Sequence, residues 1–433
     1  MTLDPALDLF PLLAGVLAAV SCGLLGNFLV LRRLSLMGDA ISHSVLPGLV
    51  IAFIVTASRD PAAMFLGAAL AGVATVVLVE IVKKLGRVEP GAAMGVVFSV
   101  LFALGVLLIE DAARQVDLDA DCVLHGQLET LVWYDAPAEW SGAFAVETIR
   151  AAPRQVETLA LVALLSSVFV IALFKELRLA AFDPALATTQ GYHAGALHYA
   201  LMILVAAATV ASFEAVGSIL VIAMLVCPAA TARLLTDRLW TQVLASVGVA
   251  VASAAGGYAA ATGIPAIAGK DSVNAAGSMA VAAGALLTAA ILFSPRHGVI
   301  AKLWRHRALA RRVAREDVVG ALYRAHESGE AAVLRAALRD RLAPRGAVGL
   351  RAALRRGLVA ERDGGLALTP AGRAEGEALV ARHRLWERFL VDEAGLAPDH
   401  VHEAAERLEH LSGGPPAGPS EDPHGRRIPR AGE

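Results

Sequence analysis

The chain has 433 residues, of which 56% are hydrophobic, with a mean hydropathy of +0.60 and a formal net charge of −2. The small net charge averages acidic and basic segments, so its distribution along the chain is more informative than its value. Three cysteines, two of them inside apolar stretches, exclude a disulfide framework and a CxxC metal site. Apolar residues are concentrated before residue 295 and charged residues after it, which predicts a membrane part followed by a soluble part.

The part from Leu9 to Phe293 repeatedly offers apolar stretches long enough to cross the hydrocarbon core of a bilayer as helices. We predict an all-α polytopic membrane domain with about eight or nine transmembrane helices. The candidate spans are 9–31, 35–57, 61–82, 91–109, 157–174, 197–212, 215–233, 239–262 and 272–293. No basic residue precedes the first span, and Arg32 and Arg33 follow it, so it is predicted to be a retained helix.

Basic residues occupy alternate loops between the predicted spans, and such loops are expected on the cytoplasmic side. They are Arg32, Arg33, Lys83, Lys84, Arg87, Lys175, Arg178, Arg233 and Arg238. Nine crossings of the cell membrane then place the N-terminus outside and the C-terminal part in the cytoplasm. The outer loop at 110–156 opens with acidic residues that either raise the local cation concentration or are merely solvated. These are Glu110, Asp111, Asp117, Asp119 and Asp121.

Asp39 and His43 stand four residues apart at the start of the second span, so a helix places them on one face. Ionisable groups inside a membrane are costly and typically face a cavity or an ion path. Oxygen and imidazole together suit Mn, Zn or Fe better than Ca or Mg. The alternative is that both residues lie at the membrane interface and only hydrogen-bond near the helix start. Glu214 is a weaker candidate ligand, or a solvated residue near the end of its span.

Between Lys175 and Leu197 the chain leaves the membrane for a short amphipathic stretch in which Asp183-Pro184 predicts a helix start. A short helix between spans offers a docking surface. The chain contains no GxxxxGKS/T phosphate loop, so ATP-driven transport would require a separate ATPase subunit.

Four segments in order resemble the zinc/manganese/iron permease family of ABC importers: LRRLSLMGDAISHSVLPG at 31–48, FDPALATTQG at 182–191, VGSILVIAMLVCPAATARLL at 216–235 and SPRHGV at 294–299. The resemblance implies a permease dimer, two cytoplasmic ATPases and an extracytoplasmic metal-binding protein that delivers the ion. It also implies that Asp39 and His43 coordinate metal along the pathway. The segment that couples to the ATPase would carry Phe182, Asp183, Pro184 and Gly191.

The soluble part begins with a basic juxtamembrane segment, followed by helical periodicity at 316–341, a second short helix, and two apolar runs that turn at Gly364-Gly365. Two helices followed by a β-hairpin are the outline of a winged helix. We therefore divide the chain into a membrane domain (1–298), a linker with a degenerate winged helix (299–370) and a helical metal-binding and dimerisation domain with a tail (371–433).

His383 and Glu387 lie four residues apart, and His402, Glu406 and His410 follow at successive four-residue steps, with Glu409 adjacent. On helices these residues form two ligand-bearing faces that could converge on one or two divalent ions. The alternative is a solvated surface helix rich in Glu, His and Arg.

The segments LTPAGRAEG, ARHRLWERFLVDEAGL, VHEAAERLEHLS and DPHGRRIP resemble iron- and manganese-dependent repressors of the diphtheria-toxin-repressor type. The resemblance implies that His383, Glu387 and His402 match the ancillary metal ligands and that Glu406, Glu409 and His410 match the primary ones. A carboxylate at 406, in place of the cysteine of the iron type, favours Mn(II). Asp317 matches a carboxylate of the manganese type, but Gly320 stands where a second acid is expected.

The segment AVGLRAALRRGLV, where these repressors read DNA, has only Arg351, Arg355 and Arg356 as polar side chains. Arginines bind phosphates, whereas base reading requires specific bidentate contacts. Sequence-specific DNA is therefore an unlikely partner.

The sequence predicts a permease subunit, not an enzyme, of an importer for Mn, or for Zn or Fe, whose fused cytoplasmic domain senses the same divalent metal. A metal ion is thus both substrate and regulatory ligand. One alternative is a membrane-tethered metal-dependent transcription regulator that no longer transports. Another is a purely structural domain that joins two permeases through its helices.

Overall fold

A computed structural model describes residues 4–58, 60–112, 128–133, 136, 152–267, 273–330, 333–342, 346–362, 364–410 and 420–429. The chain separates into two compact units, Met1–Ala301 and Lys302–Glu433, with the division inside one long helix. Of the predicted acidic loop, Asp117, Asp119 and Asp121 lie outside the described residues.

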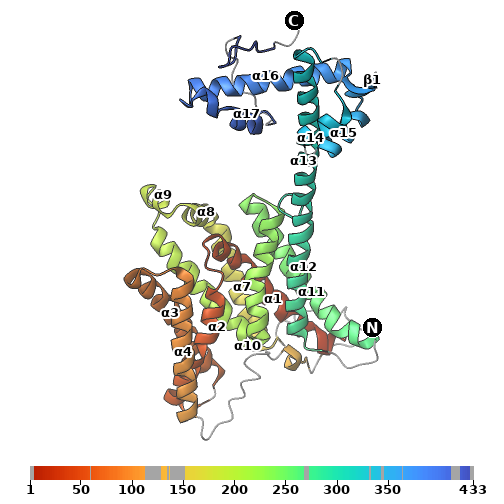
Figure 1. The fold of residues 1–433 in the computed structure, drawn as a ribbon. Coiled ribbons are helices and arrows are strands. Elements are labelled where there is room, and N and C mark those ends of the chain that lie inside the picture. Colours follow the sequence, from red (N-terminus) through yellow and green to blue (C-terminus); the bar gives the residue numbers. More distant parts are fainter. Residues whose placement is uncertain are drawn as a thin grey trace. The chain divides into compact units, whose positions relative to one another are not determined.

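The first unit is entirely helical where the structure describes it (Figure 1). Its elements are α1 (Pro5–Leu31), α2 (Met37–Thr56), α3 (Pro61–Gly86), α4 (Pro90–Ala112), the 3-10 turn η2 (Leu128–Thr130), α7 (Arg154–Ala172), α8 (Phe174–Phe182), α9 (Pro184–Thr189), α10 (Ala194–Leu235), α11 (Leu239–Ile267) and α12 (Ala275–Phe293). Eight of the described helices are long and apolar enough to cross a membrane, whereas α8 and α9 are short.

Helix α10 contains two of the nine predicted spans, 197–212 and 215–233, and reverses direction between them. Its backbone leaves the helical conformation at Gly217, where φ is 78° and ψ is 167°. His198 near its start hydrogen-bonds Arg32 directly after α1, and Gln242 at the start of α11 hydrogen-bonds Asn27 near the end of α1. Both ends of α10 therefore lie at the same end of α1. The nine predicted helices become eight because two of them are continuous through this reversal.

Gly217→Ala is expected to destabilise the membrane unit by about 1–3 kcal/mol, because this region of φ and ψ is essentially restricted to glycine. Thermal unfolding of the purified chain in detergent measures the loss. Gly248→Ala in α11 is the matched control, since a Cβ there meets nothing within 4 Å. Equal melting temperatures for the two variants would show that the reversal tolerates a side chain.

Glycines allow the closest helix approaches in this unit, as small residues do between membrane helices. Gly48 in α2 and Gly67 in α3 face each other so closely that a Cβ at either position would lie 2.3 or 2.5 Å from the other's carbonyl oxygen. A Cβ at Gly26 in α1 would lie 2.0 Å from the carbonyl oxygen of Leu225. The α2–α3 pair and the α1–α10 pair are thus fixed by backbone contact.

The second unit consists of helices and one β-hairpin. Its elements are α13 (Val299–Glu327), which crosses the division, α14 (Arg335–Arg341), α15 (Gly346–Arg355), β1 (Val359–Arg362), β2 (Gly365–Leu368), α16 (Pro370–Asp392), the 3-10 turn η4 (Pro398–His400) and α17 (His402–Leu408). Strands β1 and β2 are antiparallel, with Val359 opposite Leu368, and Val333 adds a bridge to Leu366. The core is formed by Val318, Val319, Leu322, Leu338, Leu350, Ala353, Val359 and Leu366.

The hairpin forms where the sequence predicts it, but the predicted helix at 316–341 is two helices. Helix α13 already begins at Val299 and ends at Glu327, and Gly329 follows with a φ of 89°. This left-handed conformation suits glycine and ends helices. The helix–helix–hairpin order agrees with a winged helix, and that assignment remains an interpretation.

Candidate functional site

The Asp39–His43 pair occupies the first turns of α2. His43 Nε2 lies 3.3 Å from Asp39 Oδ1, and both side chains are about one third exposed, at 34% and 35%. The imidazole packs beside the rings of Phe98 and Phe102 of α4, each with a centroid distance of 5.8 Å. Asp39 benefits from its place at a helix N-terminus, where negative charge is favoured. The pair thus offers one oxygen and one nitrogen to a cation, on a face that is neither buried nor fully open.

The two other candidate groups of the membrane unit lie on different elements. Glu214 is partly buried in α10, three positions before the reversal at Gly217. Asp183 caps α9 by accepting a hydrogen bond from the Leu186 amide at 2.9 Å, as its sequence pattern predicts. Phe182 is 62% exposed, and Ala187 is the only buried residue of α9. Nearly the whole surface of α9 is therefore exposed, as is the side chain of Phe182 at the end of α8.

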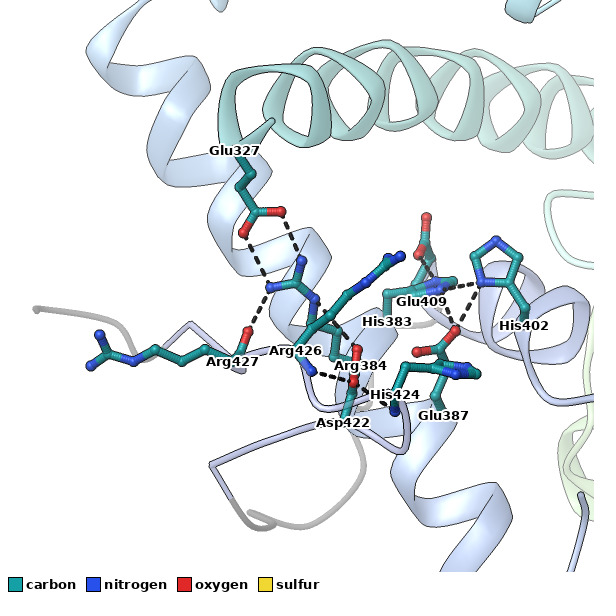
Figure 2. Close-up of polar contacts among 10 residues, drawn as sticks. All are labelled: Glu327, His383, Arg384, Glu387, His402, Glu409, Asp422, His424, Arg426 and Arg427. Carbon is teal, nitrogen blue, oxygen red and sulfur yellow. Dashed lines mark hydrogen bonds and ion pairs between the residues drawn. The ribbon is translucent and has the colours of Figure 1, made fainter. Parts of the chain in front are cut away.

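Three ligand-type side chains meet between α16 and α17 in the second unit (Figure 2). His383 Nε2 lies 3.1 Å from Glu387 Oε1 and 3.0 Å from His402 Nδ1, and His402 Nδ1 lies 2.8 Å from the same Glu387 oxygen. His383 and Glu387 are buried, whereas His402 is exposed. Two imidazoles and one carboxylate are a donor set suited to Mn, Fe or Zn. We call these residues the first group.

A second group joins α13 to the residues that follow α17. His410 Nε2 lies 3.1 Å from Asp317 Oδ1 and 3.7 Å from Glu409 Oε1. The ligand atoms of Asp317, Glu409 and His410 all lie within 4.8 Å of one another. His410 Nδ1 lies 2.8 Å from Glu316 Oε2, a contact that orients the imidazole. Two carboxylates and one imidazole form a harder donor set than that of the first group.

Glu409 contacts both groups. Its Oε2 lies 2.5 Å from His383 Nδ1, its Oε1 faces His410, and its side chain is 1% exposed. The first and second groups are therefore linked by a single buried carboxylate.

Glu406 belongs to neither group among the described residues, and its side chain is exposed on α17. Its role as a primary ligand stays a prediction. The buried Glu316, which the sequence analysis did not select, instead contacts His410 from α13 and is held by Arg312 at 2.8 Å and Arg315 at 3.3 Å. The only sequence signal for Glu316 is its position beside Asp317.

The pKa values of these groups reflect competition between burial and charge. Burial lowers the pKa of His383, but hydrogen bonds to Glu387 and Glu409 outweigh it and raise the pKa to about 9. Burial also lowers the pKa of His410, but hydrogen bonds to Asp317 and Glu316 outweigh it and raise the pKa to about 9. Burial raises the pKa of Glu387, but hydrogen bonds to His383 and His402 lower it to about 2. Without metal, protons on the two histidines therefore balance the carboxylates.

Metal-free protein is expected to lose stability in the second unit as the pH rises. The raised histidine pKa values contribute stability that is complete below about 6.5 and lost as the pH rises through about 9. The lowered pKa of Glu387 contributes stability that is present above about 4.5 and lost as the pH falls through about 2. Hydrogen exchange of α16 and α17 peptides in chelator measures this. With saturating Mn(II) the trend from pH 6.5 to 9 should reverse, because metal displaces the protons; the same trend with and without Mn(II) would contradict the assignment.

Arg384, the neighbour of His383 on α16, holds three separate segments together (Figure 2). Its guanidinium donates to both carboxylate oxygens of Glu327 in α13, at 3.1 and 2.7 Å, and to the Arg427 carbonyl at 2.5 Å. Its Nε lies 3.8 Å from the buried Asp422, which accepts hydrogen bonds from the amides of His424 and Arg426. Residues 420–429 are thereby attached beside the first group.

Arg384→Ala is expected to destabilise the second unit by about 3–5 kcal/mol, because it leaves the buried Asp422 without its cation. Hydrogen exchange and limited proteolysis at residues 420–429 report the release of this segment from Arg384 on α16. Arg388→Ala, which removes only the exposed pair with Asp392 on the same helix, is the control and should cost under about 1 kcal/mol. Unchanged protection of residues 420–429 in Arg384→Ala would refute this role.

Comparison with known proteins finds two family matches. The model of the ABC 3 transport family matches residues 9–136 and 147–291, and the iron dependent repressor, metal binding and dimerisation domain matches residues 369–413. The manganese transport system membrane protein MntD of Bacillus subtilis is 41% identical over 291 residues, covering 67% of this chain and 93% of its own. MntC of the same organism is 31% identical over 423 residues, covering 92% and 90%. The solved structure of PsaBC from Streptococcus pneumoniae in complex with Fab has 26% identity and a TM-score of 0.53, over 67% of this chain and 92% of that one.

Proposed function

Since the chain belongs to the ABC 3 transport family, we propose that it imports Mn(II), with Zn(II) or Fe(II) as alternatives, as the permease subunit of an ATP-driven transporter. It is a membrane transport subunit with a fused metal-sensing domain, and it is not an enzyme. The observation that carries the choice of a transition metal is the Asp39–His43 pair, with one carboxylate and one imidazole 3.3 Å apart in an apolar helix.

In this proposal the metal ion is the cargo, and Asp39 and His43 bind it in passage. The pair supplies only two ligands, so water or residues of a second permease subunit complete the coordination. Phe98 and Phe102 limit the movement of the His43 ring and keep its Nε2 beside the carboxylate. A binding site with few ligands suits transport, because the ion must leave as readily as it enters.

The proposed assembly contains two permease subunits, two ATPase subunits and an extracytoplasmic protein that delivers the metal. The exposed surface of α8 and α9, carrying Phe182, Asp183 and Pro184, is the proposed contact with the ATPase, and Gly191 with its φ of 87° ends that surface. In this proposal the basic loops lie on the cytoplasmic side of the membrane, and so do this surface and the second unit.

We further propose that the second unit reports cytoplasmic metal to the transporter. The first group (His383, Glu387, His402) and the second group (Asp317, Glu409, His410) hold divalent cations, whose charge there would replace the protons on His383 and His410. Asp317 lies on α13, the helix that follows α12. A cation bound to Asp317 would therefore change the contacts of α13 with His410 and Glu409. Regulation requires that the cations bind more tightly to one transporter state than to another.

Reconstitution of the permease with its ATPase in proteoliposomes tests both parts. We expect ATP-dependent uptake of Mn(II) from the side that receives the delivery protein, and a change in uptake when Mn(II) is preloaded on the opposite side. Uptake that needs no ATP would overturn the transport proposal. ATP-dependent uptake that is indifferent to preloaded metal would overturn only the sensing proposal.

DNA binding distinguishes the proposed importer from the tethered transcription regulator that the sequence offers as an alternative. Arg351, Arg355 and Arg356 are exposed on and after α15, as phosphate-binding residues would be. Such contacts bind DNA in a salt-dependent way without reading sequence. Filter binding of the purified chain to promoter fragments and to shuffled fragments should therefore give equal affinities; preference for one fragment would favour the regulator.

A further inference from the structure

A pocket of about 590 Å³ opens where α1 and α3 end and α10 begins. Its wall includes the turn after α1, the last turns of α3, the junction of α8 and α9, and the first turns of α10. Its lining combines apolar or small residues with charged ones. The charged and titratable residues of the lining are Arg32, Arg33, Glu80, Lys83 and His198.

A chain of hydrogen bonds links the charged residues Arg32, Glu80 and Lys83 of this pocket through His198. Arg32 Nη1 donates to His198 Nδ1 at 2.9 Å, and His198 Nε2 lies 3.1 Å from Glu80 Oε1, which also accepts from Lys83 Nζ at 2.7 Å. Because the guanidinium can only donate, His198 Nδ1 accepts and Nε2 carries the proton. His198 is therefore neutral in this arrangement.

The pocket carries an excess of positive charge. Arg32, Arg33 and Lys83 are cationic, and Glu80 is the only acid among the described residues of its lining. Arg32 Nε and Nη2 are buried without a hydrogen-bond partner among the described residues. Buried donors of a charged group are costly unless an acceptor pairs with them. An anion with several acceptor oxygens would offset the positive charge of this pocket.

Helix α3, which lines the pocket with Glu80 and Lys83, also carries an exposed apolar stripe. Val77, Ile81 and Leu85 of α3 are spaced by four residues on one face and are exposed, with Leu85 at 83%. Lys84, next to this stripe, lies 5.8 Å above the ring of Tyr199 at the start of α10. A lysine paired with a tyrosine at a helix end is typical of the membrane interface.

We propose that this pocket binds the phosphate of an anionic phospholipid, with the acyl chains lying along Val77, Ile81 and Leu85. Basic pockets between membrane helices at the interface have the charge that such headgroups require. The site goes beyond the transport function, since it lies on the turn between α1 and α2 and uses neither Asp39 nor His43. A bound headgroup would stabilise the α1–α2 turn, α3, α9 and α10 relative to one another.

Native mass spectrometry of the purified, delipidated full-length chain tests the site with phosphatidylglycerol as the probe. We expect phosphatidylglycerol to bind more tightly than phosphatidylcholine, and to raise the melting temperature more. Lys83→Gln and Arg33→Gln remove the positive charge but keep a polar side chain, and each should weaken binding about fivefold. Arg238→Ala removes an exposed arginine on another predicted cytoplasmic loop, outside the pocket, and should leave binding unchanged.

Three outcomes would overturn the proposal. One is equal affinity for phosphatidylglycerol in the wild type, the two pocket variants and Arg238→Ala. Another is binding of inorganic phosphate alone with the same sensitivity to the variants, which would assign the pocket to a free anion. The third is unchanged lipid binding together with lost association of the ATPase subunit, which would place an acidic side chain of that partner in the pocket.

Discussion

Asp39→Asn is expected to reduce ATP-dependent Mn(II) uptake at least 100-fold. Loss of a residue that only orients a metal ligand typically costs about 10–100-fold in affinity or activity, and the loss of a charged ligand costs more. Asparagine keeps the shape of aspartate and its place in the first turn of α2, so the missing charge is the only large change. His43→Ala should produce a comparable loss, because the oxygen and nitrogen lie 3.3 Å apart and act on one ion.

Uptake of radiolabelled Mn(II) into proteoliposomes measures this effect, with ATP hydrolysis recorded in parallel. Asp60→Asn is the matched control, since Asp60 is an acid of the same unit that accepts a hydrogen bond from the Ala63 amide at the start of α3. We expect near-normal uptake for that control. Full uptake by Asp39→Asn would remove this pair from the pathway and favour the alternative that it only hydrogen-bonds near the helix start.

Glu409→Gln is expected to weaken divalent metal binding at both groups of the second unit, by about 10–100-fold at each. Its carboxylate contacts His383 of the first group through Oε2 and His410 of the second through Oε1. Glutamine has one oxygen and no charge, so it cannot serve both imidazoles. His402→Ala should weaken only metal binding at the first group, because in the described part of the chain His402 hydrogen-bonds His383 and Glu387 of that group.

Isothermal titration of the full-length chain with Mn(II), supported by elemental analysis, measures both affinities. Glu406→Gln is the decisive companion variant. The resemblance to metal-dependent repressors makes Glu406 a primary ligand, whereas the fold leaves it exposed and outside both groups. Unchanged binding by Glu406→Gln supports the ligand sets of the fold, and a loss equal to that of Glu409→Gln supports the prediction from the sequence. In the uptake assay, Glu409→Gln should also abolish the response to preloaded metal.

Much of the architecture follows from local sequence patterns. Apolar stretches of membrane-spanning length correctly predict a helical membrane unit, because a bilayer forces each such stretch to satisfy its backbone hydrogen bonds internally. The four-residue spacing correctly brings Asp39 to His43 and His383 to Glu387, since residues four apart share a helix face. The resemblance to metal-transporting permeases is likewise confirmed by the family match.

Other features depend on contacts between segments far apart in the chain. Glu409 and His410 are adjacent in the sequence. The sequence does not reveal that Glu409 also contacts His383, because that contact requires α16 and α17 to pack together. The selection of Glu316 over Glu406 as a partner of His410 depends on how α13 lies against the residues after α17. The pairing of Arg384 with Asp422 and Glu327 joins three segments that have no common pattern.

The sequence by itself determined that the first part of the chain is a helical membrane unit and which residues are candidate ligands, because these depend on hydrophobicity, helix period and residue type. The tertiary structure decided that α10 turns back at Gly217, that Glu409 links two ligand groups and that Arg32 lines a positively charged pocket. The physical reason is that such features arise from side chains and backbone brought together only by packing. A residue's local pattern says which face it occupies, but its partner is set by the element that packs against that face.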